Sequence, residues 1–301
     1  MRRLALACLF AVLAAGSASA GWRDDLKVLK VGFVAGDNPA YEVSRMEPFR
    51  WRLQYGLAVP VELFPARSYQ ALIEAESSGR IQYAILSSLA YVALDQACDC
   101  AEPLVQPTAG NGALGFRAML VVREDGPIAD LAAAKGSRLA VGARDSISGR
   151  IAPYSGLAEE GIEPESYFAR TIETADAGAA LAALADGEVD VAVAWSIAAN
   201  PTSPETGTGP IADLAEARSG TAPALRAIWT SEVIPFGPHV VRKDLPREAR
   251  AALLDTLLEM HAAAPDAYDS AERRFSGGFV AADGSLLRRY SDMVASASTP
   301  E

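Results

Sequence analysis

The sequence predicts an α/β protein with two groups of alternating strands and helices, followed by a helical tail. Apolar runs typical of buried strands alternate with helical segments over about 26–97 and again over about 120–220. Half of the 301 residues are hydrophobic, so the chain can bury a substantial core. No internal repeat or low-complexity tract interrupts the pattern, and the length allows one or two domains.

Each expected element has a local signal. Strands are apolar runs that end in Gly or polar turns, while helices carry caps and stops, as in 68–79, which begins at Ser68 and ends at Gly79. The alternation predicts parallel strands joined by crossover helices. The expected strands are 26–36, 60–66, 81–88, 115–125, 137–142, 188–195 and 225–245. The expected helices are 41–57, 68–79, 89–97, 126–136, 150–161, 176–187, 246–264 and 285–297.

The first twenty residues have the pattern of a secretory signal peptide. Arg2 and Arg3 form a basic start, "LALACLFAVLAA" is an apolar segment too short to span a bilayer, and "SASA" supplies the small residues of a cleavage site. We expect cleavage after Ala20 and an exported, soluble mature chain in the periplasm. No later stretch is long and apolar enough to predict a membrane helix.

The charge balance restricts the class of partner. The chain has 27 basic and 38 acidic residues and a formal net charge of −11. Such an acidic surface argues against nucleic acid or an anionic membrane as a partner, although a local pocket can still hold a small anion.

The cysteines leave one question open. Cys98 and Cys100 remain after the signal segment, and they can form either a small disulfide or two separate thiols. His239 and His261 lie far away in sequence, so neither a metal site nor a cofactor is expected. His261 lies in an amphipathic helical segment, where a structural role is expected.

The segment "ARDSISGRIAPY" is the strongest candidate for a binding site, because it joins a predicted strand to a predicted helix. A helix that begins near Ser148 leaves its first N–H groups unpaired, and these groups and the helix dipole favour an anion. Ser146 and Ser148 add hydroxyl donors, and Gly149 lets a ligand approach the backbone. The alternative is a simple serine cap.

A second strand-to-helix junction, "SSLAYV", repeats this arrangement. Ser87 or Ser88 caps a helix at the carboxyl end of a predicted parallel strand, the edge where ligands of α/β sheets bind. Tyr91 can donate its hydroxyl to an anion, or it can simply be half-buried. Tyr41 follows the first strand, and it either reaches the same edge or lies on a helix surface.

Several runs together resemble the phosphate, phosphite and phosphonate substrate-binding proteins of ABC importers. The runs are "RSYQALIEAESSGRIQYAILSSLAYV", "LGFRAMLVVREDG" with the following "DSISG", "ALADGEVDVAVAW" and "IWTSEVIPFGPHVV". The first matches a family pattern of the form "dY.alieal..G.iD.a.l...aYv". The resemblance extends from about Val28 to Tyr290.

This resemblance implies a type II periplasmic binding fold, with two α/β lobes that close around a ligand. We expect a discontinuous first lobe, 21–119 with 221–301, and a second lobe, 120–220. Ser146, Ser148 and the Gly149 backbone would hold an oxyanion, and Tyr91 matches the family tyrosine that lines the cleft. The expected partners are a small anionic ligand and an ABC permease of the inner membrane, and the protein is expected to be a monomer.

The sequence departs from the family pattern around the expected site. Ile147 replaces the middle hydroxyl of a Ser-Thr-Ser run, and "TADAGAAL" lacks a histidine that many members carry. Trp195 and Ser196 stand where many members have an acidic or amide residue, which disfavours an aminoalkyl phosphonate. Trp195 either forms the floor of a site for a more apolar or cationic ligand, or it packs between the lobes. Arg144 and Arg150 flank the serine segment and either neutralise an oxyanion or are solvated.

Two other functions compete with solute binding for an importer. An enzyme is disfavoured, because no His, Lys or Cys stands near Ser148 in sequence to act as its base and the motif is not GxSxG. A sensor that presents its ligand state to a membrane partner has the same fold, so the sequence does not separate the two. A sulfonate, a carboxylate or a cationic or aromatic compound is the alternative ligand.

Overall fold

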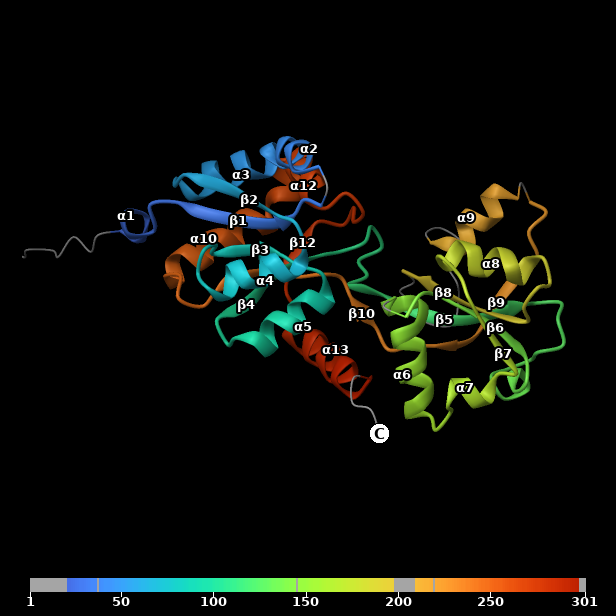
Figure 1. Cartoon of the computed structure of the whole chain (residues 1–301). Helices are drawn as coiled ribbons and strands as arrows, with labels where there is room; N and C mark the ends of the chain where they lie inside the picture. Colours follow the sequence, from blue (N-terminus) through green and yellow to red (C-terminus); the bar gives the residue numbers. More distant parts are fainter. Residues whose placement is uncertain (1–20, 37, 145, 198–208, 219, 298–301) are drawn as a thin grey trace, which may run out of the picture.

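The computed structural model describes residues 21–36, 38–144, 146–197, 209–218 and 220–297. The predicted signal segment therefore lies outside the described residues. Two separate sheets of six strands lie side by side with helices packed on their faces, and we call each sheet with its helices a lobe (Figure 1). Among the described residues, no helix combines the length and apolarity needed to cross a bilayer.

The first lobe contains a mixed sheet in the order β12-β4-β11-β3-β1-β2. Strand β1 pairs in parallel with β2 and β3, whereas β11 pairs antiparallel with β3 and β4. Its strands are β1 (Leu29–Val34), β2 (Val61–Ala66), β3 (Tyr83–Ile85), β4 (Ala101–Pro107), β11 (His239–Arg242) and β12 (Phe279–Ala281). Its helices are α1 (Trp22–Leu26), α2 (Pro39–Arg45), α3 (Glu47–Leu57), α4 (Tyr69–Ser77), α5 (Ser88–Ala97), α10 (Arg247–Leu258), α11 (Met260–Ala263) and α12 (Pro265–Ala271).

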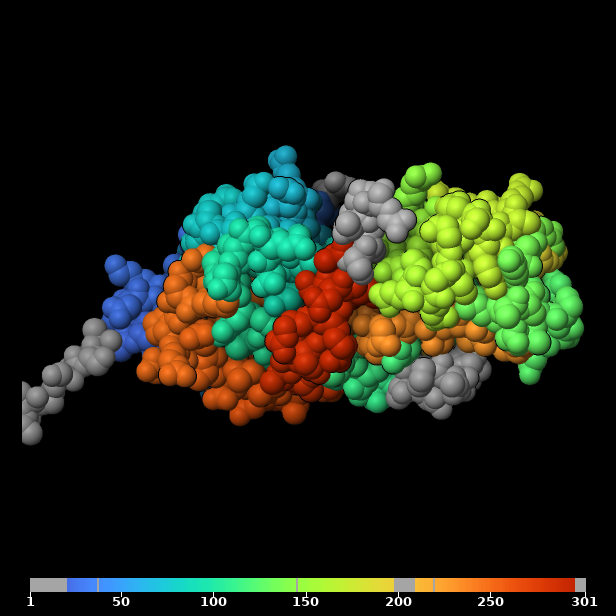
Figure 2. All heavy atoms as spheres, turned by 90° about the horizontal axis from the view of Figure 1, so that it is seen from below, coloured from blue at the N-terminus to red at the C-terminus, as the bar shows by residue number. Residues whose placement is uncertain are grey.

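The second lobe contains the order β10-β5-β8-β6-β7, with β9 also paired to β5. Strand β6 is parallel to β7 and β8, and β5 is antiparallel to β8 and β9. Its strands are β5 (Gly115–Arg123), β6 (Arg138–Val141), β7 (Arg170–Glu173), β8 (Val191–Ser196), β9 (Leu225–Thr230) and β10 (Ile234–Pro235). Its helical segments are η1 (Ala132–Ala134), η2 (Ile147–Ile151), α6 (Ala152–Glu159), α7 (Pro164–Tyr167), α8 (Ala177–Ala185) and α9 (Pro210–Ala217). The last helix, α13 (Gly284–Ala297), lies between the lobes (Figure 2).

Apolar side chains on both faces of each sheet form the cores. In the first lobe, Val31 of β1 belongs to a buried cluster with Phe49 of α3, and a separate cluster joins Ala84 of β3 to Leu72 of α4. The second lobe likewise has one cluster that includes α6 and another that includes α8. Each lobe is thus a sheet between two helical layers, as the two predicted groups required.

The structure differs from the predicted elements in two helices and in the direction of some strands. The predicted helix 126–136 is only the short turn η1, because the Asp130 carboxylate accepts from the Ala133 N–H at 2.9 Å and stabilises a local turn. The predicted helix 41–57 is two helices, because Pro48 lacks the N–H that a continuous helix would need. Both sheets are mixed, not purely parallel, because β11 and β12 pair antiparallel in the first sheet and β5 pairs antiparallel in the second.

The chain crosses between the lobes twice, from β4 to β5 and from β10 back to β11. Residues 115–119 and Leu225–Thr230 belong to the second sheet, although the proposed lobe limits assign both to the first lobe. The limits at 120 and 221 stay a proposal.

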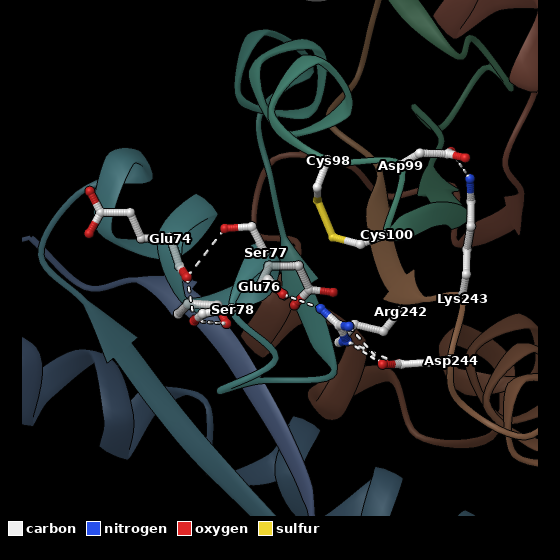
Figure 3. Close-up of a disulfide and its surroundings, with 11 residues drawn as sticks. Glu74, Glu76, Ser77, Ser78, Cys98, Asp99, Cys100, Arg242, Lys243 and Asp244 are labelled. Atoms are coloured by element: carbon white, nitrogen blue, oxygen red, sulfur yellow. Dashed lines mark hydrogen bonds and ion pairs between the residues drawn. A yellow bond between two sulfur atoms is a disulfide. The ribbon is translucent and has the colours of Figure 1, made fainter.

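The question left open for Cys98 and Cys100 has an answer, since the two form a disulfide at the end of α5 (Figure 3).

Candidate ligand-binding site

Three parallel strands of the second lobe end at one edge of their sheet, and a pocket of about 160 Å³ lies there. The segment after β6 supplies the two predicted serines, the segment after β7 leads into α8, and Trp195 is the last residue but one of β8. Four predicted residues therefore come together. The pocket is lined by Gly142, Ser146, Ser148, Gly149, Ala175, Asp176, Ala177, Val193, Ala194 and Trp195.

The serine segment forms the start of a helix one residue earlier than expected. Ser146 is the N-cap, and its Oγ accepts a hydrogen bond of 3.0 Å from the Gly149 N–H. The Gly149 N–H is therefore engaged by its own cap, whereas the Ser146 hydroxyl hydrogen can still donate to a ligand. Ser148 lies in the first turn and lines the pocket with its neighbours.

Gly149 has a structural reason to be glycine. A Cβ at this position would lie 2.9 Å from the Gly142 Cα and 2.6 Å from the Ser146 Oγ. The Gly142 N–H also donates to the Gly149 carbonyl at 2.9 Å, which ties the helix start to the end of β6. The close approach that the sequence predicted is thus made by the chain itself.

The two flanking arginines differ. Arg150 is held by its own lobe, because it donates to the Gly142 carbonyl at 3.2 Å, pairs with Glu173 at 3.2 Å and lies over the Tyr154 ring. Arg150 is therefore neither freely solvated nor unpaired, because it holds the serine segment to the rest of its lobe. Arg144 is exposed, in agreement with the solvated alternative.

Trp195 lines the pocket, whereas Ile147 packs into an apolar cluster. Ile147 packs against a buried apolar cluster that includes Ile234 and Tyr290. Trp195 lines the pocket and meets Phe116 of β5 edge-on, with ring centroids 6.1 Å apart. Trp195 therefore packs within its own lobe while one side faces the pocket.

Asp176 is a pocket residue that sequence reasoning did not identify. It is the N-cap of α8, and its carboxylate accepts from the Ala179 N–H at 2.8 Å. The signal was present in "TADAGAAL", where an Asp directly precedes a helical run after a strand. The pocket thus contains a carboxylate beside two serines, although this chain has Trp195 and Ser196 where many family members have an acidic or amide residue.

The first lobe presents its own candidate residues at the carboxyl ends of β1, β2 and β3. Ser87 is the N-cap of α5, and its Oγ accepts from the Ala90 N–H at 3.1 Å. Ser88 is buried and donates to the Pro235 carbonyl, so it fastens α5 to the crossover instead of facing a ligand. Tyr41 is 55% exposed on α2, as expected for a helix-surface aromatic.

Two further tyrosines of the first lobe, Tyr91 and Tyr69, have hydroxyls whose pKa is raised by burial. Tyr91 is half-buried, and burial raises the pKa of its hydroxyl, with a further increase from Asp95 and a decrease from Arg288 of α13. Tyr69, which sequence reasoning passed over, is the first residue of α4 after β2. Burial raises the pKa of its hydroxyl, against a lowering effect of the nearby Ser87. The "SY" of "RSYQAL" was the available signal.

Two mixed sheets joined by two crossovers define the type II periplasmic binding fold, and solved structures agree. A Xanthomonas citri protein solved with bound ATP matches with a TM-score of 0.62 and 19% identity, over 90% of this chain and 97% of that chain. A Prochlorococcus marinus protein solved with methylphosphonate matches with a TM-score of 0.55 and 18% identity, over 89% and 97% of the two chains.

The family follows from the sequence match. The family model for the periplasmic substrate-binding protein of phosphonate ABC transporters matches residues 31–287, so the chain belongs to this family. A phosphonates-binding periplasmic protein of Escherichia coli is 28% identical over 235 residues, which cover 76% of this chain and 65% of that relative, less than two thirds of its length. The family consists of periplasmic binding proteins, which are not enzymes, as the sequence predicted.

Proposed function

We propose that this protein captures a small oxyanion of the phosphonate, phosphite or phosphate type and delivers it to an ABC permease of the inner membrane. The observation that carries the proposal is the pocket in which the Ser146 and Ser148 hydroxyls lie beside the N-termini of η2 and α8. Hydroxyl donors and helix N-termini are the groups that bind anions without a metal. We expect the protein to act as a monomer.

The pocket of about 160 Å³ is lined by the second lobe alone. Ser87 and Tyr69 lie together at the corresponding edge of the first lobe, where a hydroxyl pair can supply the other half of a site. We propose that the lobes close by rotation about the two crossovers, so that both halves contact one ligand. Closure would also exclude water and strengthen each charged hydrogen bond.

Asp176 bears on the class of oxyanion. A carboxylate in the pocket repels a fully ionised anion, but it can pair with an ammonium group of the same ligand or accept a hydrogen bond from the P–OH group of a monoprotonated phosphonate. The Escherichia coli relative is described as phosphonates-binding, and the Prochlorococcus structure holds methylphosphonate. Alkyl and aminoalkyl phosphonates are therefore the first ligands to test. The aminoalkyl compounds, which the sequence alone disfavours, are included because the Asp176 carboxylate can pair with their ammonium group.

The test is a thermal-shift and calorimetry screen of the chain from residue 21. The panel contains phosphate, phosphite, methylphosphonate, 2-aminoethylphosphonate, a sulfonate and a carboxylate. A ligand at a hundredfold excess over its Kd should stabilise the fold by ~2.7 kcal/mol. The Ser148→Ala variant should lose affinity, whereas Ser166→Ala, which removes an exposed serine of the same lobe, should not. A screen in which no oxyanion changes the melting temperature would refute the proposal.

A further inference from the structure

Helix α13 is the last described element, and it contacts both lobes. It packs against α5 of the first lobe, α6 of the second lobe and the crossover strand β10. Figure 1 shows it below the crossovers, and Figure 2 shows it lying between the two lobes. Helices α5 and α6 begin at Ser88 and Ala152, next to the candidate binding segments of their lobes. The helix therefore connects the two elements that a ligand would bring together.

The contacts of α13 form one apolar cluster across the lobes, which we call the hinge cluster. Val92 of α5 is 2% exposed, Ala152 of α6 is fully buried, and Tyr290 of α13 is 2% exposed. Ile147, between the two pocket serines, packs against the same cluster. Among the described residues, the buried members of this cluster are Val92, Ala118, Ala152, Ile234, Tyr290 and Met293. This burial stabilises the arrangement of lobes in which the pocket is lined by the second lobe alone.

One polar group in the hinge cluster opposes that arrangement. The Tyr290 hydroxyl is buried with no hydrogen-bond partner among the described residues. Tyr290 also lines a cavity of about 540 Å³ between α6, α13 and the crossover, together with Glu159 and Ser231. A buried hydroxyl without a partner is costly, and the cost disappears when a polar group or water reaches it.

We propose that the hinge cluster holds the lobes apart and thereby sets the affinity for the ligand. A rigid rotation of the lobes changes the separation of α5 and α6, and α13 cannot keep its packing on both, because packed cores do not deform continuously. Apparent affinity is proportional to the fraction of molecules competent to close. Weakening the cluster therefore tightens ligand binding, and strengthening it weakens binding. The inference rests on the proposed closure about one ligand.

The test uses two variants that should change the ligand affinity in opposite directions. Val92→Ala removes two methyl groups from the cluster and should lower the melting temperature of the ligand-free protein while binding methylphosphonate about tenfold more tightly, which is 1.4 kcal/mol. Tyr290→Phe removes the hydroxyl without a partner and should raise the ligand-free melting temperature while binding about tenfold more weakly. The matched control is Val59→Ala in the first-lobe core, which should lower the melting temperature and leave affinity unchanged.

A readout without ligand separates this inference from the proposed function. Spin labels at Tyr55→Cys and Glu216→Cys, on exposed positions of the two lobes, report the distance between the lobes. Val92→Ala should add a population at a different distance, and Tyr290→Phe should narrow the distribution. If wild type binds no oxyanion but the distances respond, only the proposed function fails. Unchanged distances in both variants, or equal affinities of Val92→Ala and Val59→Ala, would overturn the role of the cluster.

Discussion

Glu76 of α4 gives the clearest prediction on stability. It is fully buried, and neither carboxylate oxygen has a hydrogen-bond partner among the described residues. Arg242 lies beside it, but this guanidinium pairs with Asp244 at 2.7 Å and donates to the main-chain carbonyl of Glu76 at 2.6 Å (Figure 3). Burial raises the pKa of Glu76 from 4.5 to about 8, against a lowering effect of Arg242 and with a small further rise from Asp244.

The sign of the pH dependence follows from the raised pKa. The folded protein keeps Glu76 neutral up to about pH 8, whereas the unfolded chain ionises it above pH 4.5. The contribution of this group to stability is therefore complete below pH 4.5 and is lost as the pH rises through 8. The loss is ~1.4 kcal/mol per pH unit within that window and on the order of 5 kcal/mol in total.

Glu76→Gln places a permanently neutral side chain of the same shape at this position. We expect the free energy of unfolding, measured in urea from pH 5 to pH 9, to fall with pH in wild type and to vary much less in Glu76→Gln. The control is Glu74→Gln on the same helix, where Glu74 is exposed and should leave the wild-type slope unchanged. Acids whose pKa is lowered in the folded protein, such as Asp190 and Asp244, are already ionised in both the folded and the unfolded chain at pH 5 and above. Their contribution to stability is therefore constant over the measured range, and it is the same in wild type, Glu76→Gln and Glu74→Gln. Parallel pH profiles for wild type and Glu76→Gln would refute the reasoning.

Three further predictions concern the site and the start of the chain. Ser146→Ala should cost about 1 kcal/mol of folding stability through loss of the N-cap, whereas calorimetry on Ser148→Ala should show about ten- to a hundredfold weaker oxyanion binding. Asp176→Asn should weaken binding of 2-aminoethylphosphonate relative to methylphosphonate, and an equal effect on both would exclude a contact with the ammonium group. N-terminal sequencing of the exported protein should begin at Gly21, and an uncleaved product would contradict the predicted signal peptide.

Local sequence predicted those parts of the site that are formed by neighbouring residues. The serine segment follows β6 directly, so its hydroxyls and glycine had to lie at the edge of the second sheet. Trp195 was placed in the same way, because it lies at the carboxyl end of β8, one residue before the last. Asp176 was missed although it caps a helix after a strand, because a cap residue looks the same in sequence whether or not it faces a pocket. Tyr69 follows the cap Ser68 as the first residue of α4, and its local sequence likewise does not distinguish a site residue from an ordinary surface one.

The contacts between distant segments could not be predicted from local patterns. Ser88 has the sequence context of a cap, yet its hydroxyl donates to the Pro235 carbonyl, 147 residues further along the chain. Strand β9 lies in a stretch that was assigned to the first lobe, but it pairs with β5 because the chain crosses back only afterwards. Strand signals give the period of burial and not the partner, so the mixed order of both sheets depends on the crossovers.

The replacement of a family hydroxyl by Ile147 can be interpreted from its packing. Ser146 is the N-cap with extended backbone, and Ile147 is the first residue of the helical turn that follows it. Those two serines line the pocket, and Ile147 instead packs on the hinge cluster. We therefore interpret the missing hydroxyl as a change in the contact between the pocket segment and α13. Differences in ligand class from other family members are then to be sought at Asp176 and Trp195, which do line the pocket.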